Sequence, residues 1–218
     1  MFRIKICGVR LKSEVDAVAS AGADAVGFNF FPRSIRYLSD REKTTRELSQ
    51  HASTHNLLRV GVFVNETARQ MLEVADRVGL DAVQLHGDES LGSTHALQTS
   101  GLGLIRAVKL PRNALDPSEI DQAIKAWSEA GFHVLLDADG GKHHGGSGKT
   151  LHWESVRRWA EQADEARWTL AGGLKPENVA SAIEMTGASS IDTASGVECP
   201  RGVKNASRIH EFVSNATQ

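Results

Sequence analysis

The sequence has few cysteines and no long hydrophobic run, and each shortage excludes a class of protein. Its two cysteines, Cys7 and Cys199, cannot build a disulfide framework, so a reducing cytoplasm is the expected compartment. The longest apolar stretches have the length of strands, far short of the roughly 20 residues that cross a bilayer. The first ten residues, MFRIKICGVR, carry charges where a secretory signal needs an apolar segment. We therefore expect neither a membrane span nor export.

Long runs of one charge sign are also missing. The chain has 25 Lys and Arg residues against 27 Asp and Glu, a formal net charge of -2, so nucleic acid is not an expected partner. With 40% hydrophobic residues, 218 residues can bury a sizeable core. No linker or low-complexity tract divides the chain, and residues 1–218 are expected to form one domain.

Short β-rich segments alternate with amphipathic segments along the whole chain. Val15, Val18 and Ala19 lie at helical spacing, and residues 66–79 show the same pattern and close with Gly79 as a helix stop. The β-rich segments predict eight strands, at 3–8, 25–30, 58–64, 82–86, 104–110, 133–138, 169–173 and 190–196.

Eight strand–helix units predict an α/β fold, a single (β/α)8 barrel. Parallel strands joined by right-handed crossovers form either an open doubly wound sheet or a closed barrel, and eight units in just over 200 residues favour the barrel. The chemistry of such a barrel lies at the C-terminal ends of its strands. The polar residues and glycines at these ends are Cys7, residues 29–36, Asn65, His86, Lys109, Asp137, Gly172, Gly173, Ser195 and Gly196.

The glycine-rich stretch GGKHHGGSGKT (140–150) resembles a nucleotide-binding loop. In that motif a glycine precedes Gly148-Lys149-Thr150 by five positions, but position 143 is a histidine. The preceding strand is also the sixth of eight rather than an early strand of an open sheet. A nucleoside-triphosphate site is therefore disfavoured.

No metal site is required by the sequence. His143 and His144 are adjacent, so on an extended loop their side chains point in opposite directions. No CxxC, HExxH or comparable carboxylate–histidine spacing is present.

An ordered set of motifs resembles the phosphoribosylanthranilate isomerase family over nearly the whole chain. No single motif carries the resemblance; their order does. They are KICG (5–8), GADAVGF (22–28), PRSIRY (32–37), GVFVN (61–65), VQLHGDE (83–89), LLDA (135–138), GGSGKT (145–150), AGGLKPENV (171–179) and SGVE (195–198). The resemblance implies a cofactor-independent (β/α)8 isomerase of tryptophan biosynthesis that acts on a small phosphorylated substrate by an Amadori rearrangement.

The resemblance also implies the catalytic pair. Cys7 matches the family's general base, which removes the C2′ proton, and Asp137 matches its general acid, which protonates the ring oxygen of the sugar. Taken alone, Cys7 would more often be a buried small hydrophobe, and Asp137 a helix cap or turn residue. A thiol and a carboxyl have ordinary pKa values near ~8.5 and ~3.9. Cys7 therefore needs positive surroundings, and Asp137 needs desolvation or nearby negative charge.

Substrate-binding residues follow from the same resemblance. The loops holding Gly172–Gly173 and Ser195–Gly196 match those that bind the substrate phosphate, with Gly145 and Gly146 in a covering loop. Arg36 matches the arginine that faces the anthranilate carboxylate, and His86 belongs to a family motif. These glycines could instead serve only tight turns, Arg36 could be a surface residue, and His86 could only position a loop.

The sequence departs from the family's usual pattern beside the phosphate loop. IDTASG (191–196) replaces a more usual VDVSSG, so Ala194 removes a hydroxyl. His152 stands where an aspartate often precedes the tryptophan. The segment DADGGKHH (137–144) also differs from the common loop.

Two pairings follow from a closed barrel. Lys5 shares a strand face with Cys7, so an inward-facing Lys5 needs a buried partner, for which we expect Asp192 on the neighbouring eighth strand. Because the first and eighth strands are neighbours, Cys199 could approach Cys7 and pair with it under oxidation. A non-catalytic barrel that binds sugar phosphates remains the alternative function, and either a monomer or a homodimer is compatible with the sequence.

Overall fold

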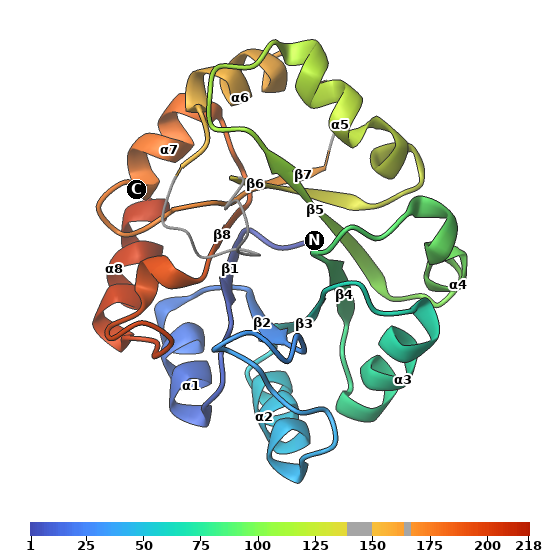
Figure 1. Cartoon of the computed structure of the whole chain (residues 1–218). Helices are drawn as coiled ribbons and strands as arrows, with labels where there is room; N and C mark the ends of the chain where they lie inside the picture. Colours follow the sequence, from blue (N-terminus) through green and yellow to red (C-terminus); the bar gives the residue numbers. More distant parts are fainter. Residues whose placement is uncertain (139–149, 164–166) are drawn as a thin grey trace.

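The chain folds into a closed barrel of parallel strands inside a ring of helices (Figure 1). The computed structural model describes residues 1–138, 150–163 and 167–218. Its strands pair in chain order, and the last pairs with the first. They are β1 (Ile4–Cys7), β2 (Ala25–Asn29), β3 (Leu58–Phe63), β4 (Ala82–Leu85), β5 (Gly103–Leu110), β6 (His133–Ala138), β7 (Trp168–Leu170) and β8 (Ile191–Thr193). The predicted (β/α)8 barrel is confirmed.

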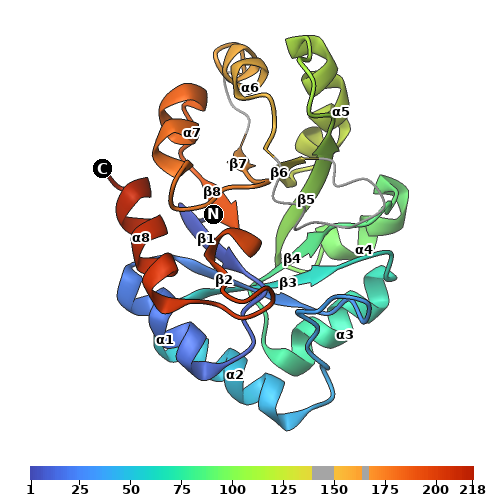
Figure 2. The same cartoon turned by 60° about the vertical axis from the view of Figure 1, so that its left-hand side comes forward.

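The helices follow one another around the barrel in the order of the chain (Figures 1 and 2). The α-helices are α1 (Lys12–Ala21), α2 (Lys43–Thr54), α3 (Ala68–Val78), α4 (His95–Gln98), α5 (Pro117–Glu129), α6 (Trp153–Ala160), α7 (Val179–Thr186) and α8 (Ala206–Ala216). Two 3-10 turns are η1 (Leu91–Thr94) and η2 (Ser195–Val197). Over the described part of the chain, no helix combines the length and apolar character needed to cross a membrane.

Local signals in the sequence explain where the helices begin and end. Thr67 caps α3 by accepting a hydrogen bond from the amide of Gln70, and Gly79 ends that helix with a positive φ of 76°. Asp116 caps α5 just before Pro117, whose fixed φ suits the first helical position.

The barrel wall separates two apolar layers. On β1, Ile4 and Ile6 join the large core between the strands and the helices. A smaller cluster fills the barrel itself and consists of Phe2, Ala25, Val60, Ala82, Ile105, Ala107, Leu135 and Ala171. Because side chains alternate along a strand, Lys5 and Cys7 face the barrel interior.

The last two strands are shorter than the sequence pattern predicted. β7 ends at Leu170 rather than at residue 173, because Gly172 and Gly173 have positive φ values of 81° and 67° that cannot continue a strand. β8 covers three residues of the predicted 190–196, because the chain turns into η2 at Ser195. The glycine-rich stretch with Gly145 and Gly146 lies outside the described residues.

A buried ion pair joins β1 to β8 where the barrel closes. Lys5 Nζ lies 2.7 Å from Asp192 Oδ1, the two residues are directly paired across the strands, and the lysine side chain is fully buried. The expected pairing is confirmed. Burial by itself lowers the pKa of Lys5, but the Asp192 carboxylate and the Cys7 thiol outweigh it and raise that pKa above its ordinary value. Lys5 is therefore a permanent positive charge in the barrel.

Removing this lysine should destabilise the fold strongly. Lys5→Met leaves the Asp192 carboxylate buried without its partner, and we expect a loss of about 3 kcal/mol in the free energy of unfolding, measured in urea. Lys12→Met is the matched control, because Lys12 is exposed and its 3.9 Å contact with Glu47 should contribute less than about 1 kcal/mol. Equal losses in the two variants would show that the buried pair has no special role.

Candidate active site

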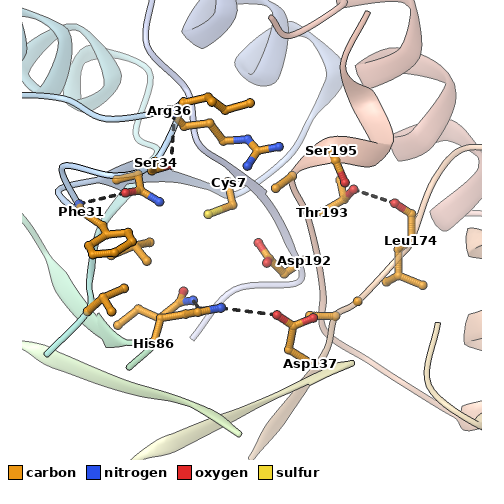
Figure 3. A pocket seen from close by; sticks show the side chains of 18 of the residues that line it. Cys7, Phe31, Ser34, Arg36, His86, Asp137, Leu174, Asp192, Thr193 and Ser195 are labelled. Carbon is orange, nitrogen blue, oxygen red and sulfur yellow. Dashed lines mark hydrogen bonds and ion pairs between the residues drawn. The ribbon is translucent and has the colours of Figure 1, made fainter. Parts of the chain in front are cut away.

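A pocket of about 350 Å³ opens at the C-terminal end of the barrel (Figure 3). Its volume lies in the range of small-molecule sites. Seven of the residues predicted for the site line it, namely Cys7, Arg36, His86, Asp137, Gly172, Gly173 and Ser195. Gly196 lies beside this lining, and Gly145 and Gly146 lie outside the described residues. The lining also includes Arg33, Gln84, Asp192 and Arg201, which the sequence reasoning did not assign to substrate.

Cys7 ends β1 inside a ring of charged groups. Burial raises the pKa of its thiol above the ordinary value, and the Asp192 carboxylate acts in the same direction. The positive charges of Lys5, Lys204 and Arg36 oppose this shift without reversing it. The expected positive surroundings are present, yet the net shift favours the protonated thiol in the unliganded site.

Cys199 is a free thiol like Cys7, but the two differ in exposure. Cys7 is buried at the bottom of the pocket, whereas Cys199 is exposed. Their pairing under oxidation stays a prediction.

Asp137 is the last residue but one of β6 and contacts His86, which directly follows β4, two strands away. His86 Nε2 lies 3.4 Å from Asp137 Oδ2, and both side chains are about 12% exposed. On the other side of the ring, the Gln84 amide nitrogen lies 3.1 Å from His86 Nδ1. With the amide in this orientation Nδ1 is the acceptor, so the ring proton is on Nε2, the nitrogen that faces Asp137. His86 therefore positions the carboxyl group that it faces (Figure 3).

Arg36 is held by a carboxylate that the sequence reasoning missed. Its Nε and Nη2 donate to the two oxygens of Glu198 at 2.6 and 2.8 Å, in a bidentate pair. Lys204 Nζ and the Gly202 amide also donate to Glu198, at 2.9 and 2.8 Å. Burial by itself raises the pKa of Glu198, but these donors lower it to about 2. Glu198 is thus a fixed negative charge that orients Arg36.

This arrangement leaves one edge of the arginine for a ligand. Glu198 occupies the Nε/Nη2 edge, so the Nη1/Nη2 edge is the one that can receive a second carboxylate. Figure 3 shows the guanidinium of Arg36 directed into the pocket near Cys7. The signal for Glu198 was present in the sequence, since it is the last residue of the SGVE motif (195–198).

The loops after β7 and β8 are fastened to each other. Thr193 Oγ1 donates to the Leu174 carbonyl at 2.7 Å, and a Cβ added at Gly196 would lie 1.9 Å from that carbonyl oxygen. Only glycine fits at position 196. Consecutive positive-φ glycines at 172 and 173 bring bare backbone to the pocket wall, a geometry that suits an anion.

Ala194, which departs from the usual family pattern, also lines this part of the pocket. Its carbonyl accepts a hydrogen bond from Lys204 Nζ at 2.7 Å. The missing hydroxyl therefore leaves the backbone contact of this position in place.

Comparisons with known proteins point to one family. The sequence profile of the N-(5'-phosphoribosyl)anthranilate isomerase family matches residues 4–215. The isomerase of Thermotoga neapolitana is 39% identical over 217 residues, which cover 99% of this chain and 98% of the relative. The isomerase of Rubrobacter xylanophilus is 39% identical over 216 residues and 99% of both chains.

Solved structures of the same family share the fold. The phosphoribosylanthranilate isomerase of Thermotoga maritima superposes with a TM-score of 0.84 at 35% identity, covering 100% of this chain and 99% of its own. A second solved isomerase, with a TM-score of 0.81 and 33% identity, is in complex with reduced 1-(o-carboxyphenylamino)-1-deoxyribulose 5-phosphate. It covers 100% of this chain and 99% of its own.

The raised pKa of Cys7 should be measurable by alkylation. Only the thiolate reacts with iodoacetamide, so its rate should rise with pH through a midpoint above the ordinary cysteine value of ~8.5. The measurement uses a Cys199→Ser background, so that Cys7 is the only thiol, and the urea-unfolded chain supplies the reference midpoint. A folded midpoint at or below the unfolded one would mean that the cations, not burial, dominate this site.

Proposed function

The chain belongs to the N-(5'-phosphoribosyl)anthranilate isomerase family of tryptophan biosynthesis and is an isomerase, and we propose that Cys7 and Asp137 carry its two proton transfers. Cys7 acts as general base and Asp137 as general acid in an Amadori rearrangement of N-(5-phosphoribosyl)anthranilate. The observation that carries this proposal is that both side chains enter one pocket, from the ends of β1 and β6 (Figure 3).

Asp137 acts first, at the furanose ring. Its carboxyl group donates a proton to the ring oxygen, the bond from C1′ to that oxygen breaks, and the anthranilate nitrogen lone pair forms the C1′=N bond of a protonated Schiff base. The contact with His86 supports this role by fixing the direction of the carboxyl group. The nitrogen of the substrate acts as the electron sink.

Cys7 acts next, at C2′. The cationic nitrogen makes the C2′ proton acidic, and the thiolate removes it while the C2′–H electrons form C1′=C2′ and neutralise the nitrogen. Protonation of the resulting enolamine at C1′ and loss of the hydroxyl proton at C2′ give the aminodeoxyribulose phosphate. Atoms and charge balance without an added cofactor.

Substrate charge supports the required protonation states. Burial favours a neutral Cys7, whereas the reaction needs a thiolate with a protonated acid opposite it. The Schiff-base cation favours the thiolate of Cys7 as soon as the ring has opened.

The substrate's two anionic ends fit opposite parts of the pocket. The free edge of Arg36 suits the anthranilate carboxylate through two parallel hydrogen bonds. The glycines at 172 and 173 and Ser195 suit the phosphate, with Gly196 keeping the two loops in contact. Thus the phosphorylated substrate spans the barrel mouth above Cys7.

The solved relatives support a phosphorylated ligand of this size. One is in complex with a reduced carboxyphenylamino-deoxyribulose phosphate.

Another solved relative is a monomer form of a dimeric isomerase from Thermotoga maritima. For this chain, a monomer and a homodimer both stay predictions.

Removing either proton-transfer group should abolish turnover without abolishing binding. We expect Cys7→Ser and Asp137→Asn to lower kcat by about 10²- to 10⁴-fold each, with much smaller changes in KM. The assay follows the loss of fluorescence as freshly made phosphoribosylanthranilate is consumed. Cys199→Ser is the matched control and should keep full activity, because Cys199 lies outside the pocket lining. Full activity of Cys7→Ser would favour a different base, and no turnover by the wild type would favour a sugar-phosphate-binding barrel.

Glu198 should matter for substrate binding through Arg36. Glu198→Gln removes the bidentate partner that orients the guanidinium, and we expect KM to rise about tenfold, equivalent to ~1.4 kcal/mol, with kcat less affected. Glu73→Gln breaks an exposed arginine–glutamate pair far from the pocket and should leave both constants unchanged. A fall in kcat alone for Glu198→Gln would contradict a binding role for Arg36.

A further inference from the structure

The outer wall of the barrel carries a histidine cluster that the isomerase chemistry does not use. Helices α1 and α2 lie side by side in both views of the molecule (Figures 1 and 2). Asp16 lies on α1, His51 on the last turn of α2, and His55 directly after that helix. The sequence places His51 and His55 four residues apart, but the carboxylate that meets them comes 35 residues before the first histidine, so sequence spacing does not reveal the whole group.

The three side chains converge on one point. The Nε2 atoms of His51 and His55 lie 2.6 and 3.2 Å from the same oxygen, Asp16 Oδ1. One potential ligand atom from each residue lies within 4.8 Å of the other two. The two imidazole rings meet edge to face, with their centroids 4.9 Å apart. Among the described residues, this is the one group of three His, Cys, Asp or Glu residues whose ligand atoms lie so close together.

We propose that Asp16, His51 and His55 form a binding site for a divalent transition-metal ion of the zinc type. Two imidazole nitrogens and one carboxylate oxygen form a ligand set that suits Zn²⁺, Ni²⁺ or Cu²⁺ and does not suit Ca²⁺ or Mg²⁺. With metal–ligand bonds of about 2.0–2.2 Å, the ligand atoms of one ion are separated by about 3 Å. The separations of the two histidine nitrogens from Asp16 Oδ1, 2.6 and 3.2 Å, are close to that value, so small side-chain rotations admit the ion.

The surroundings leave room for the ion and its remaining ligands. The side chains of Asp16, His51 and His55 are 55%, 29% and 36% exposed, so water can complete the coordination. Lys12, one turn before Asp16 on α1, contacts Glu47. A bound ion would join α1 to α2 outside the catalytic pocket.

Zinc titration of the tag-free protein tests the proposal. By calorimetry at neutral pH we expect one Zn²⁺ per chain at this site, and a rise in Tm with zinc concentration because the ion binds the folded state. The variant His51→Gln/His55→Gln should weaken this binding at least about tenfold, since losing even an outer hydrogen-bond partner of a ligand costs 10- to 100-fold. The same variant should lose the zinc-dependent rise in Tm. Asp16→Asn supplies an independent test that keeps both imidazoles.

Matched controls separate this cluster from other zinc ligands of the chain. His143→Gln/His144→Gln removes two other histidines, and replacement of both cysteines by serine removes the thiols; neither change should reduce binding. The proposal is wrong if His51→Gln/His55→Gln and Asp16→Asn bind zinc as tightly as the wild type. It is equally wrong if binding disappears with the other histidines or with the cysteines. Calcium should produce neither heat nor a Tm shift at the same concentrations.

Discussion

The buried ion pair between Lys5 and Asp192 sets the charge of the barrel interior. It links β1 to β8, the seam at which the barrel closes, and lies one inward-facing position away from Cys7. Lys5 acts to lower the pKa of the thiol, whereas burial and Asp192 both raise it and together prevail. The same two side chains therefore close the fold and act on the pKa of the proposed base.

A second charged group extends this arrangement toward the pocket mouth. Glu198 binds Arg36 and Lys204 at once, and the fully buried Lys204 side chain also donates to the Ala194 carbonyl, beside the loop that we propose for the phosphate. A negative group in the middle keeps two cations in place and leaves one edge of Arg36 for substrate. The shared carboxylate offsets the repulsion between Arg36 and Lys204, so a small pocket can hold both positive charges.

Much of the fold followed from the sequence because its signals are local. The strand-forming segments and the cap at Asp116 act within a few residues, and the Lys5–Asp192 pair followed from alternation plus barrel closure. The contact between His86 and Asp137 could not be predicted in this way, because it joins the residue after β4 to β6 across the barrel interior rather than two neighbouring strands. Glu198 was likewise missed, since it lies beyond η2 and its arginine comes 162 residues earlier. The short β7 and β8 depended on turn geometry at Gly172 and Ser195 that composition does not specify.

We propose that Cys7 is the general base and Asp137 the general acid. A crystal structure of this chain with the reduced carboxyphenylamino-deoxyribulose phosphate is the most direct test of these two roles. The account predicts Cys7 Sγ within about 3.5 Å of C2′, Asp137 facing the sugar oxygen that was in the ring, and the carboxylate on Arg36. The phosphate should lie against the backbone of residues 172–173 and 195. A ligand bound in the reverse direction, with its phosphate on Arg36 and Cys7 away from C2′, would contradict the account.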